Sequence, residues 1–403
     1  MKYTLFTILA LVIVTNLSAQ NKSLIYQIES KNLQSTNYQA LSIIEGVFDK
    51  TQLKATTNIL TLDLPNNTQI DLVNTRLKYI TNNQYSWFGH VVGNSKSKVN
   101  FAVVDKSISG SIFLDNQVFE IVSLDNNRVR VIQLDLDNYE ACDGGIPVVT
   151  QNKTKSKSDK SITGTSTQMD VLIVYSNDTL AAIGSIASVE SLAQASIDNM
   201  NTSLADSQLL SGVDSINVVA IIGVDRDESG DSNTELNWLR GDANVLSLRN
   251  QYGADLVSMI SATTGCGIGY VMRNPGPGFS EFAFQVTKYT CAVGNLTMAH
   301  EFGHNLGLEH NPENSSTWPN NGSYPYSYAQ YHDGAYRTVM SYSAPCTMGC
   351  TRRMYYSNPD VIFNSLATGV VDEKDNTRSL EQNTLFTVDF RTSAEFIFTN
   401  GFE

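Results

Sequence analysis

The most informative part of the sequence is HEFGHNLGLEH, residues 300–310. The chain has 403 residues and five histidines, and three of those histidines fall inside these eleven positions. His300 and His304 are four residues apart, so on an α-helix their side chains lie on one face about 6 Å apart. Two imidazoles placed in this way can each give one nitrogen to a tetrahedral zinc ion. The stretch therefore predicts a helix that carries two metal ligands.

The residues around this pair complete the prediction. Gly307 can adopt the left-handed conformation that ends a helix and turns the chain sharply. The turn would return His310 toward the metal as a third ligand. Glu301 points about 100° around the helix from His300, so we expect it to face a water molecule rather than the metal. Three protein ligands and one position open for water are typical of catalytic zinc, whereas structural zinc is usually enclosed by cysteines.

The pattern HExxHxxGxxH in residues 300–310 resembles that of the metzincin clan of zinc metallopeptidases. Those enzymes carry a tight turn with a methionine beneath the metal, and the resemblance assigns this Met-turn to Met340 in TVMSY. Residues 169–391 are similar in their order of strands and helices to the reprolysin (adamalysin)-like branch, especially its bacterial secreted members. The upstream stretch YSWFGHVVGNSKSKVNFAVVD, residues 85–105, resembles the propeptides of that branch.

The resemblance implies both a fold and an activity. The expected fold is α/β, of the α+β kind, with a mixed twisted sheet and an active-site helix, preceded by a β-rich propeptide domain. The expected activity is that of a zinc endopeptidase made as a zymogen, with one catalytic Zn²⁺ held by His300, His304 and His310. Its partners would be protein or peptide substrates and its own propeptide as inhibitor. Glu301 would act as general base, a role that typically contributes about 10²–10⁴-fold to the rate.

Two residues depart from the reprolysin-like pattern. Adamalysin-like enzymes usually have Asp after the third His, whereas Asn311 follows His310 here. Tyr342 follows Met340 by two residues, which resembles astacins and serralysins, where this tyrosine binds the metal at rest and swings toward the transition state. By that likeness Tyr342 is a catalytic residue that donates a hydrogen bond to the oxyanion; packing in a Tyr-rich loop is the alternative. Both departures concern the branch rather than the clan.

Five cysteines are present, and Cys142 stands alone in the first half of the chain. A thiolate is a better zinc ligand than water, so Cys142 could act as a latency switch that blocks the open position, as in several metzincin propeptides. A free thiol, or a pairing with a later cysteine, is the alternative. The other four allow three pairings. We favour Cys266 with Cys291 and Cys346 with Cys350, chiefly because this leaves Cys142 free.

The N-terminus predicts export. MKYTLFTILALVIVTNLSAQ combines Lys2, an apolar run and the small residue Ala19, which is typical of a signal peptide cleaved after Ala19. A secreted, extracellular location permits disulfide bonds. No apolar run reaches the roughly 20 residues that a membrane helix needs, so we expect no membrane span. The predicted division is a signal peptide at 1–19, a β-rich propeptide and linker at 20–165, a catalytic domain at 166–392, and a C-terminal tail of unknown role at 393–403.

Hydrophobic periodicity supports this division. Short runs such as KVNFAVVD, QVFEIVSLD and RVRVIQLDLD alternate apolar and polar residues up to about residue 136, which predicts an antiparallel meander with one solvent-exposed face. QNKTKSKSDKSITGTST, residues 151–167, is nearly free of apolar residues and predicts a linker open to proteolysis. Strand and helix patterns then alternate. EFAFQVTKY, residues 281–289, reads as an edge strand.

The net charge and one acidic loop limit the ligands that the chain can be expected to bind. A net charge of −13 without a basic stripe excludes a nucleic-acid partner. DRDESGDSN, residues 225–233, echoes a calcium loop, but Leu236 holds the twelfth position where a bidentate Glu is expected, so an acidic surface turn is favoured over a Ca²⁺ site. Two alternative functions remain: a secreted binding or adhesion protein on a peptidase fold, and a zinc hydrolase of cell-wall peptides.

Overall fold

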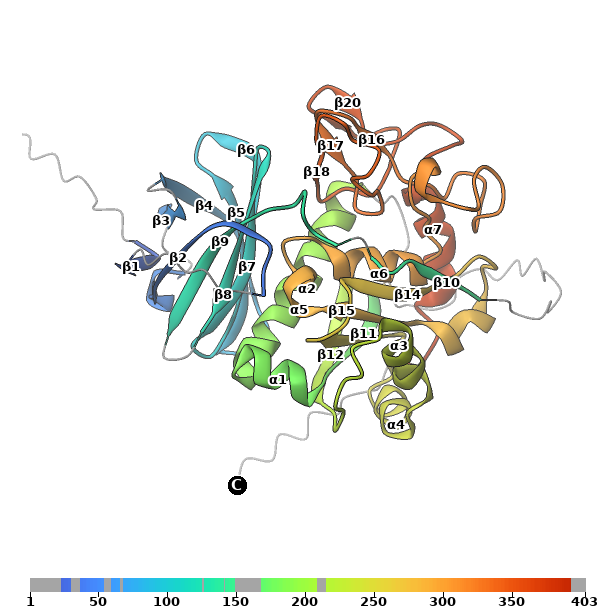
Figure 1. The fold of residues 1–403 in the computed structure, drawn as a ribbon, viewed down its shortest axis with the longest axis horizontal. Helices are drawn as coiled ribbons and strands as arrows, with labels where there is room; N and C mark the ends of the chain where they lie inside the picture. Colours follow the sequence, from blue (N-terminus) through green and yellow to red (C-terminus); the bar gives the residue numbers. More distant parts are fainter. Residues whose placement is uncertain are drawn as a thin grey trace, which may run out of the picture.

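The structure is a computed structural model that describes residues 23–29, 37–53, 59–65, 68–124, 127–140, 142–148, 168–208 and 215–392. A β-rich N-terminal part lies beside an α/β body, and an irregular C-terminal part lies above that body (Figure 1). The predicted fold class is therefore confirmed. The predicted signal peptide at 1–19, the linker residues 149–167 and the tail at 393–403 lie outside the described residues.

The N-terminal part is a nine-stranded sheet in the order β1-β2-β9-β8-β7-β6-β5-β4-β3, and every pair of neighbours in it is antiparallel. From β3 to β9 each strand pairs with the next in sequence, as the predicted meander requires. One face buries a hydrophobic cluster that includes Leu60, Trp87 and Phe101. The strands are β1 Ile25–Glu29, β2 Ala40–Phe48, β3 Ile59–Leu64, β4 Thr68–Tyr79, β5 Gln84–Val91, β6 Asn94–Val104, β7 Ser107–Leu114, β8 Gln117–Ser123 and β9 Arg128–Leu134.

The opposite face of this sheet is not solvent-exposed at β6 and β7, so that prediction is wrong for the central strands. Helix α2, Ile186–Asp206, packs on it. Ser109 Oγ lies 2.9 Å from Ser191 Oγ, and Asn100 Nδ2 donates to Asn199 Oδ1 at 2.9 Å. The small polar residues on this face had suggested that it is exposed to water. In the structure they form hydrogen bonds with polar residues of the helix, so they are satisfied without water.

The α/β body is built on a six-stranded sheet in the order β10-β14-β15-β13-β11-β12. Strands β12, β11, β13 and β15 are parallel, and β14 is antiparallel to β15. Strand β10, from the segment before the linker, adds to β14 in parallel. The strands are β10 Gly145–Pro147, β11 Gln168–Tyr175, β12 Ser215–Gly223, β13 Leu256–Ser261, β14 Gly267–Val271 and β15 Phe284–Lys288.

The prediction of an edge strand at residues 281–289 is wrong. Strand β15 lies between β13 and β14, and its first four residues are buried. The edge strands of the body are β10 and β12. Strand β14, next to β10, has the sequence GIGYV and was not predicted as a strand because glycine carries little β propensity. The position of β14 matters for the metal centre described below.

Helices cover the body, and several of them begin at a residue whose side chain caps the first turn. Ser185 accepts the Ser188 N–H at the start of α2, and Asp375 accepts the Arg378 N–H at the start of α7. Among the described residues no single helix is long and apolar enough to cross a membrane, although the bent pair α1–α2 meets that length and composition test. The other helices are α1 Asn177–Ile183, α3 Ser232–Gly241, α4 Ala243–Gln251, α5 Tyr289–Ala292, α6 Thr297–Asn305 and α7 Asn376–Thr387.

The C-terminal part between α6 and α7 is mostly irregular and holds short strands. It is fastened by a disulfide between Cys346 and Cys350, and a second disulfide joins Cys266 to Cys291 in the body. Cys142 forms no disulfide. This is the pairing that the sequence favoured. The short strands are β16 Tyr331–His332, β17 Tyr336–Arg337, β18 Thr351–Arg352, β19 Ile362–Phe363 and β20 Leu366–Ala367.

A buried carboxyl joins the N-terminal sheet to the body. Glu120 on β8 is 1% exposed, and its Oε2 accepts the N–H of Gly294, just before α6, at 2.9 Å. Burial raises the pKa of Glu120 to about 8, and hydrogen bonds from Gly294 and Tyr38 offset only part of that rise. The folded chain therefore holds a proton here that the unfolded chain releases between the ordinary pKa of 4.5 and about 8.

We expect this carboxyl to make the protein less stable as the pH rises from 5 to 8. Its own contribution should be about 1.4 kcal/mol per pH unit, because one proton is lost on unfolding in that window. Glu120→Gln removes this slope, so its free energy of unfolding should exceed that of the wild type at pH 8. Urea unfolding at several pH values measures the slope.

Glu45→Gln is the matched control for this prediction. Burial raises the pKa of Glu45, but the ion pairs with Arg130 and Arg128 lower it by more, so the net shift is downward. Glu45 therefore stays ionised from pH 5 to 8. That variant should change the stability by a constant amount from pH 5 to 8. Equal slopes for the wild type and Glu120→Gln would contradict the prediction.

Candidate metal centre

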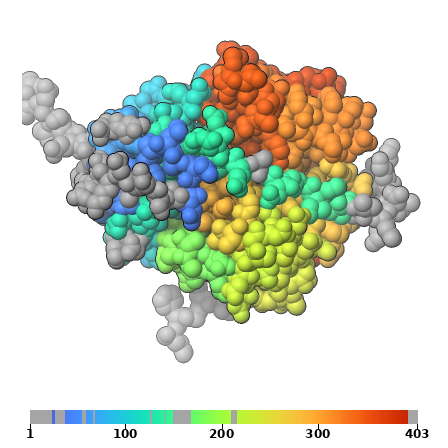
Figure 2. Space-filling view, viewed as in Figure 1, coloured from blue at the N-terminus to red at the C-terminus, as the bar shows by residue number. Residues whose placement is uncertain are grey.

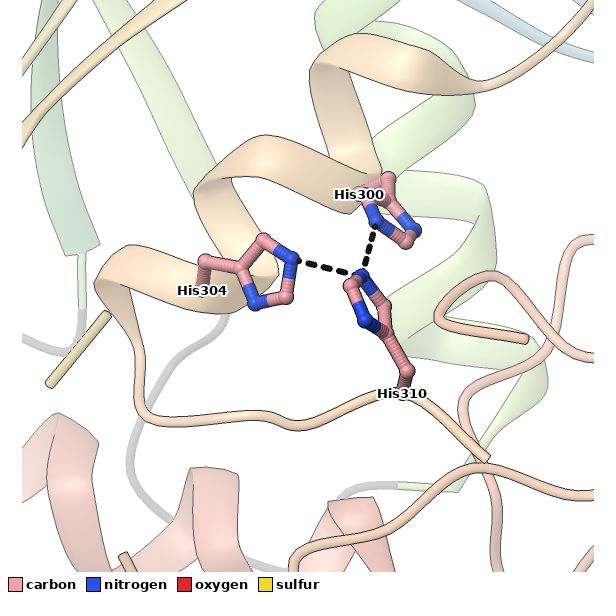
Figure 3. Close-up of side chains that lie close together, drawn as sticks. All are labelled: His300, His304 and His310. Carbon is pink, nitrogen blue, oxygen red and sulfur yellow. Dashed lines mark hydrogen bonds between the residues drawn. The ribbon is translucent and has the colours of Figure 1, made fainter. Parts of the chain in front are cut away.

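The structure brings the three predicted histidine ligands together (Figure 3). Helix α6 carries His300 and His304, and its helical part ends at Asn305. Gly307 then has φ +85°, the left-handed conformation that the sequence predicted for this turn. His310 returns so that its Nε2 lies 3.1 Å from Nε2 of His300 and 3.0 Å from Nε2 of His304.

The chemistry of these rings fits a divalent cation. His300 Nδ1 lies 3.0 Å from the carbonyl oxygen of Val339, and His304 Nδ1 lies 2.8 Å from that of Leu308. A ring nitrogen that faces a carbonyl carries the proton, so the other nitrogen presents its lone pair. Burial is the main cause that lowers the pKa of all three histidines, which favours neutral rings. Tetrahedral zinc would hold its nitrogens roughly 3.3 Å apart, close to the observed spacing.

The turn that carries Met340, which the sequence predicted as a Met-turn, packs against helix α6. Met340 is fully buried, and a Cβ built on Gly303 would lie only 2.3 Å from its Sδ. Glycine inside a helix costs about 1 kcal/mol relative to alanine, and the close approach of Met340 explains why it is needed here. The residue before Met340, Val339, supplies the carbonyl that orients His300. The turn at residues 339–340 therefore positions helix α6 and also orients the His300 ring.

Glu301 lies on the same helix and faces strand β14 of the body. It is fully buried, and burial raises its pKa to about 8 against smaller lowering effects of Cys142 and Arg352. A Cβ on Gly267 would lie 2.7 Å from Glu301 Oε1, and one on Gly269 would lie 3.1 Å from its carbonyl oxygen. The two glycines of β14 therefore make the room that Glu301 occupies. They are site residues that the sequence analysis missed, and the spacing GIG was the available signal.

Cys142 lies at the centre as well. Its Sγ, a ring nitrogen of His300 and a carboxylate oxygen of Glu301 all lie within 4.8 Å of one another. The chain around Cys142 is held by backbone contacts: the Asp143 N–H donates to the carbonyl of Gly267 at 2.9 Å, and β10 then pairs with β14. Figure 2 shows this teal segment, between β9 and β10, lying between the orange C-terminal part and the yellow-green body.

Tyr342 packs directly on the histidines. Its ring centroid lies 4.1 Å from that of His310, and its hydroxyl donates to the carbonyl oxygen of Cys142 at 3.2 Å. Burial is the main cause that raises its pKa above the usual range for tyrosine. The Tyr342 N–H donates to Oδ1 of Asn311 at 3.0 Å. Asn311, where adamalysin-like enzymes usually have Asp, therefore supplies an acceptor that fixes the Met-turn.

Comparison with known proteins places the histidine centre within a metallopeptidase domain. Residues 165–355 match the reprolysin family model described as metallo-peptidase family M12, and this range contains all three histidines, Glu301 and Met340. The chain carries a metzincin-type metallopeptidase domain. A metal is implied by that family, and His300, His304 and His310 offer it a site.

Several relatives of this metallopeptidase domain have been named. Two proteins of Stenotrophomonas maltophilia, strains R551-3 and K279a, are called peptidyl-Asp metalloendopeptidase and are 26% and 27% identical, each over 68% of this chain and 66% of its own length. The chain thus spans just under two thirds of these relatives. A Pseudomonas aeruginosa protein of the same name is 30% identical over 37% of this chain and 28% of its own.

Solved structures resemble the metallopeptidase chain only loosely. Metalloproteinase-II from Bacteroides fragilis has a TM-score of 0.38 and 14% identity, over 62% of this chain and 81% of that one. A likeness of this size says nothing about the site.

The acidic turn at residues 225–233 lies elsewhere in the metallopeptidase domain and has structural contacts. Asp231 accepts the Thr234 N–H as the N-cap of α3, and Glu235 forms an ion pair with Arg226 at 2.8 Å. Among the described residues, the groups of three that could hold a metal both lie at the histidine centre. The carboxylates of the turn therefore have identified partners within the protein.

Proposed function

We propose that this chain is a zinc-dependent endopeptidase, exported and made as a zymogen. The observation that carries the proposal is the convergence of three buried histidine lone pairs beside a buried carboxylate. The peptidyl-Asp metalloendopeptidase names of its relatives support peptide-bond hydrolysis next to aspartate as the activity. The proposal also keeps the division into a propeptide at 20–165 and a catalytic domain at 166–392.

Each residue of the centre has a separate role in the proposed peptide hydrolysis. Zn²⁺ held by His300, His304 and His310 would polarise the scissile carbonyl and ease the ionisation of water. Glu301 then accepts the proton of the attacking water and passes it to the leaving amine. The Tyr342 hydroxyl donates a hydrogen bond to the oxyanion once it no longer donates one to the carbonyl of Cys142.

Release of the segment that carries Cys142 would open the centre to substrate. Strand β10 now occupies the outer side of β14, so its departure frees the backbone N–H and C=O groups of β14. A peptide can add to such a free sheet edge through main-chain hydrogen bonds. The scissile bond would then lie beside Glu301, which contacts the glycines of that strand.

Export and activation are parts of the same proposal. Two disulfides favour an oxidising compartment, which is consistent with cleavage of a signal peptide after Ala19. The lysines of residues 151–167 would offer the activating protease its site. Cys142 and strand β10 lie before this segment in the sequence, so a cut there separates them from the catalytic chain.

Metal removal tests the proposal. We expect a chelator to abolish casein cleavage by the activated protein and added Zn²⁺ to restore it. His304→Ala removes one of three ligands, so the purified variant should contain far less than one zinc ion per chain by elemental analysis. His332→Ala is the control: His332 lies outside the centre, with its ring nitrogen 2.8 Å from the carbonyl oxygen of Ala367, and should keep the ion. Proteolysis by metal-free protein would contradict the proposal, and a zinc-loaded protein that cleaves nothing would favour the binding-protein alternative.

A further inference from the structure

Two buried arginines lie on the short strands that precede and follow the turn at Met340. Arg337 on β17 and Arg352 on β18 are partners in a parallel strand pair, and they are 3% and 4% exposed. Arg352 Nη1 donates to the carbonyl of Asn295 at 2.7 Å, and its Nη2 donates to that of Ser341 at 3.3 Å. Arg352 therefore bridges the chain that enters α6 and the Met-turn, the two segments that hold the histidines.

Arg337 has no such anchor. Nε and Nη1 of Arg337 are buried and have no hydrogen-bond partner among the described residues. Burial is the main cause that lowers the pKa of Arg337, and the neighbouring charge of Arg352 lowers it further. A buried guanidinium with two unpartnered nitrogens, beside a second positive charge, is costly unless an anion joins it. The pair is thus a built site for an anionic group.

The ionisable groups that favour a charged Arg337 belong to the segment that we propose is removed. Cys142 and Asp137 are the groups that raise the pKa of Arg337, in opposition to its burial. Both precede residues 149–167, where activation would cut the chain. Arg352 interacts with Cys142, Tyr342 and Glu301, which keeps the pair within the electrostatic field of the catalytic residues. Activation would therefore remove both groups, while Arg337 stays two residues from Val339, whose carbonyl oxygen lies 3.0 Å from Nδ1 of His300.

We propose that Arg337 is the specificity-determining residue of this enzyme and binds the side-chain carboxylate of a substrate aspartate that flanks the scissile bond. Arg352 is a positioning residue, since two of its donors are used by carbonyls of the framework. A planar guanidinium can hold a carboxylate through two parallel hydrogen bonds, which also fixes its orientation. The proposal rests on the proposed peptidase function and assigns the residue that reads the substrate.

Paired peptides that differ only by Asp or Asn at the cleavage site test this assignment. The full chain is expressed and then nicked within residues 149–167 with trypsin, and kcat/KM is measured for both peptides. We expect the wild type to prefer Asp by about 100-fold, the scale for an unpaired buried charge. Arg337→Gln should bring this ratio close to one by losing the Asp reaction while it keeps the Asn reaction. Arg337→Lys keeps the charge without the two-pronged geometry and should give an intermediate ratio.

Arg353→Gln is the matched control. Arg353 follows Arg352 in sequence and is also buried, but its Nη2 donates to Oδ1 of Asn116 in the N-terminal sheet at 3.3 Å. This variant should keep the wild-type ratio. A wild-type ratio retained by Arg337→Gln, or an equal loss on both peptides, would overturn the assignment.

A binding measurement separates this assignment from the proposed function. The two peptides are titrated into the zinc-loaded, nicked Glu301→Gln variant, and affinities are read by calorimetry with and without Arg337→Gln. We expect the Asp peptide to bind about 100-fold more tightly only when Arg337 is present. Equal affinities would overturn the assignment. A wild type that cleaves neither peptide would instead contradict the peptidase function, and the binding ratio would still decide the role of Arg337.

Discussion

Glu301→Gln is expected to lower kcat/KM for peptide hydrolysis by about 10²–10⁴-fold and to leave one zinc ion per chain. The amide has the shape of the carboxylate but cannot accept a proton from the attacking water. It also fits the same place, because the space beside Glu301 is made by the glycines of β14 and not by a charged partner. Steady-state kinetics on a fluorogenic peptide and elemental analysis of the same preparation measure the two quantities.

The control separates loss of the base from loss of a nearby charge. Glu313 is an exposed carboxylate three residues after His310, and it accepts a hydrogen bond from Asn311. Glu313→Gln should retain both the rate and the metal. Activity of Glu301→Gln near that of the wild type would remove Glu301 from the proton transfer. Loss of zinc together with activity would show that Glu301 holds the site together rather than moves a proton.

The metal centre could be predicted from sequence because its geometry is local. Helical periodicity alone places His300 and His304 on one face, and a single glycine with positive φ turns the chain toward His310. All three ligands therefore lie within eleven residues, and no distant contact is needed to expect them together. The antiparallel meander was predictable for the same reason, since each of its strands pairs with the next.

Features that depend on distant contacts could not be predicted. The polar face of β6 and β7 gave no sign that α2, about a hundred residues later, would cover it. Gly303 is unfavourable in a helix, and only the packing of Met340, 37 residues later in the chain, explains why it is needed there. No periodicity marks Arg337 and Arg352 as buried, because their burial follows from the pairing of two short strands.

The position of Cys142 required the structure too. The sequence supplied a lone cysteine and a family resemblance, but not the path of the chain that carries it. In the structure that path is fixed from both sides, by Tyr342 through the Cys142 carbonyl and by β14 through the Asp143 N–H. The thiol is thus held at the histidines by backbone contacts that do not depend on the thiol itself, which permits a test that removes only the sulfur.

Cys142→Ala is expected to raise the peptidase activity of the uncut chain by about 10–1,000-fold, the range set by a minor open state of 0.1–10%. Without the thiol, nothing at position 142 can replace water at the metal. The activity should remain below that of the cut enzyme, because β10 still pairs with β14 and restricts the substrate. Fluorogenic peptide assays measure the rise, with gel electrophoresis to verify that the chain is intact.

The uncut state is secured by replacing the linker lysines with Gln in both proteins, namely Lys153, Lys155, Lys157 and Lys160. Asp143→Asn is the matched control: its carboxylate accepts a hydrogen bond from Ser232, away from the histidines, so this variant should stay latent. Two mechanisms of latency then give different results. If the thiol blocks the metal, Cys142→Ala alone is active. If uncut Cys142→Ala is as inactive as the uncut wild type, the main chain of residues 142–147 blocks the site by itself. Cys142 is then not the latency switch.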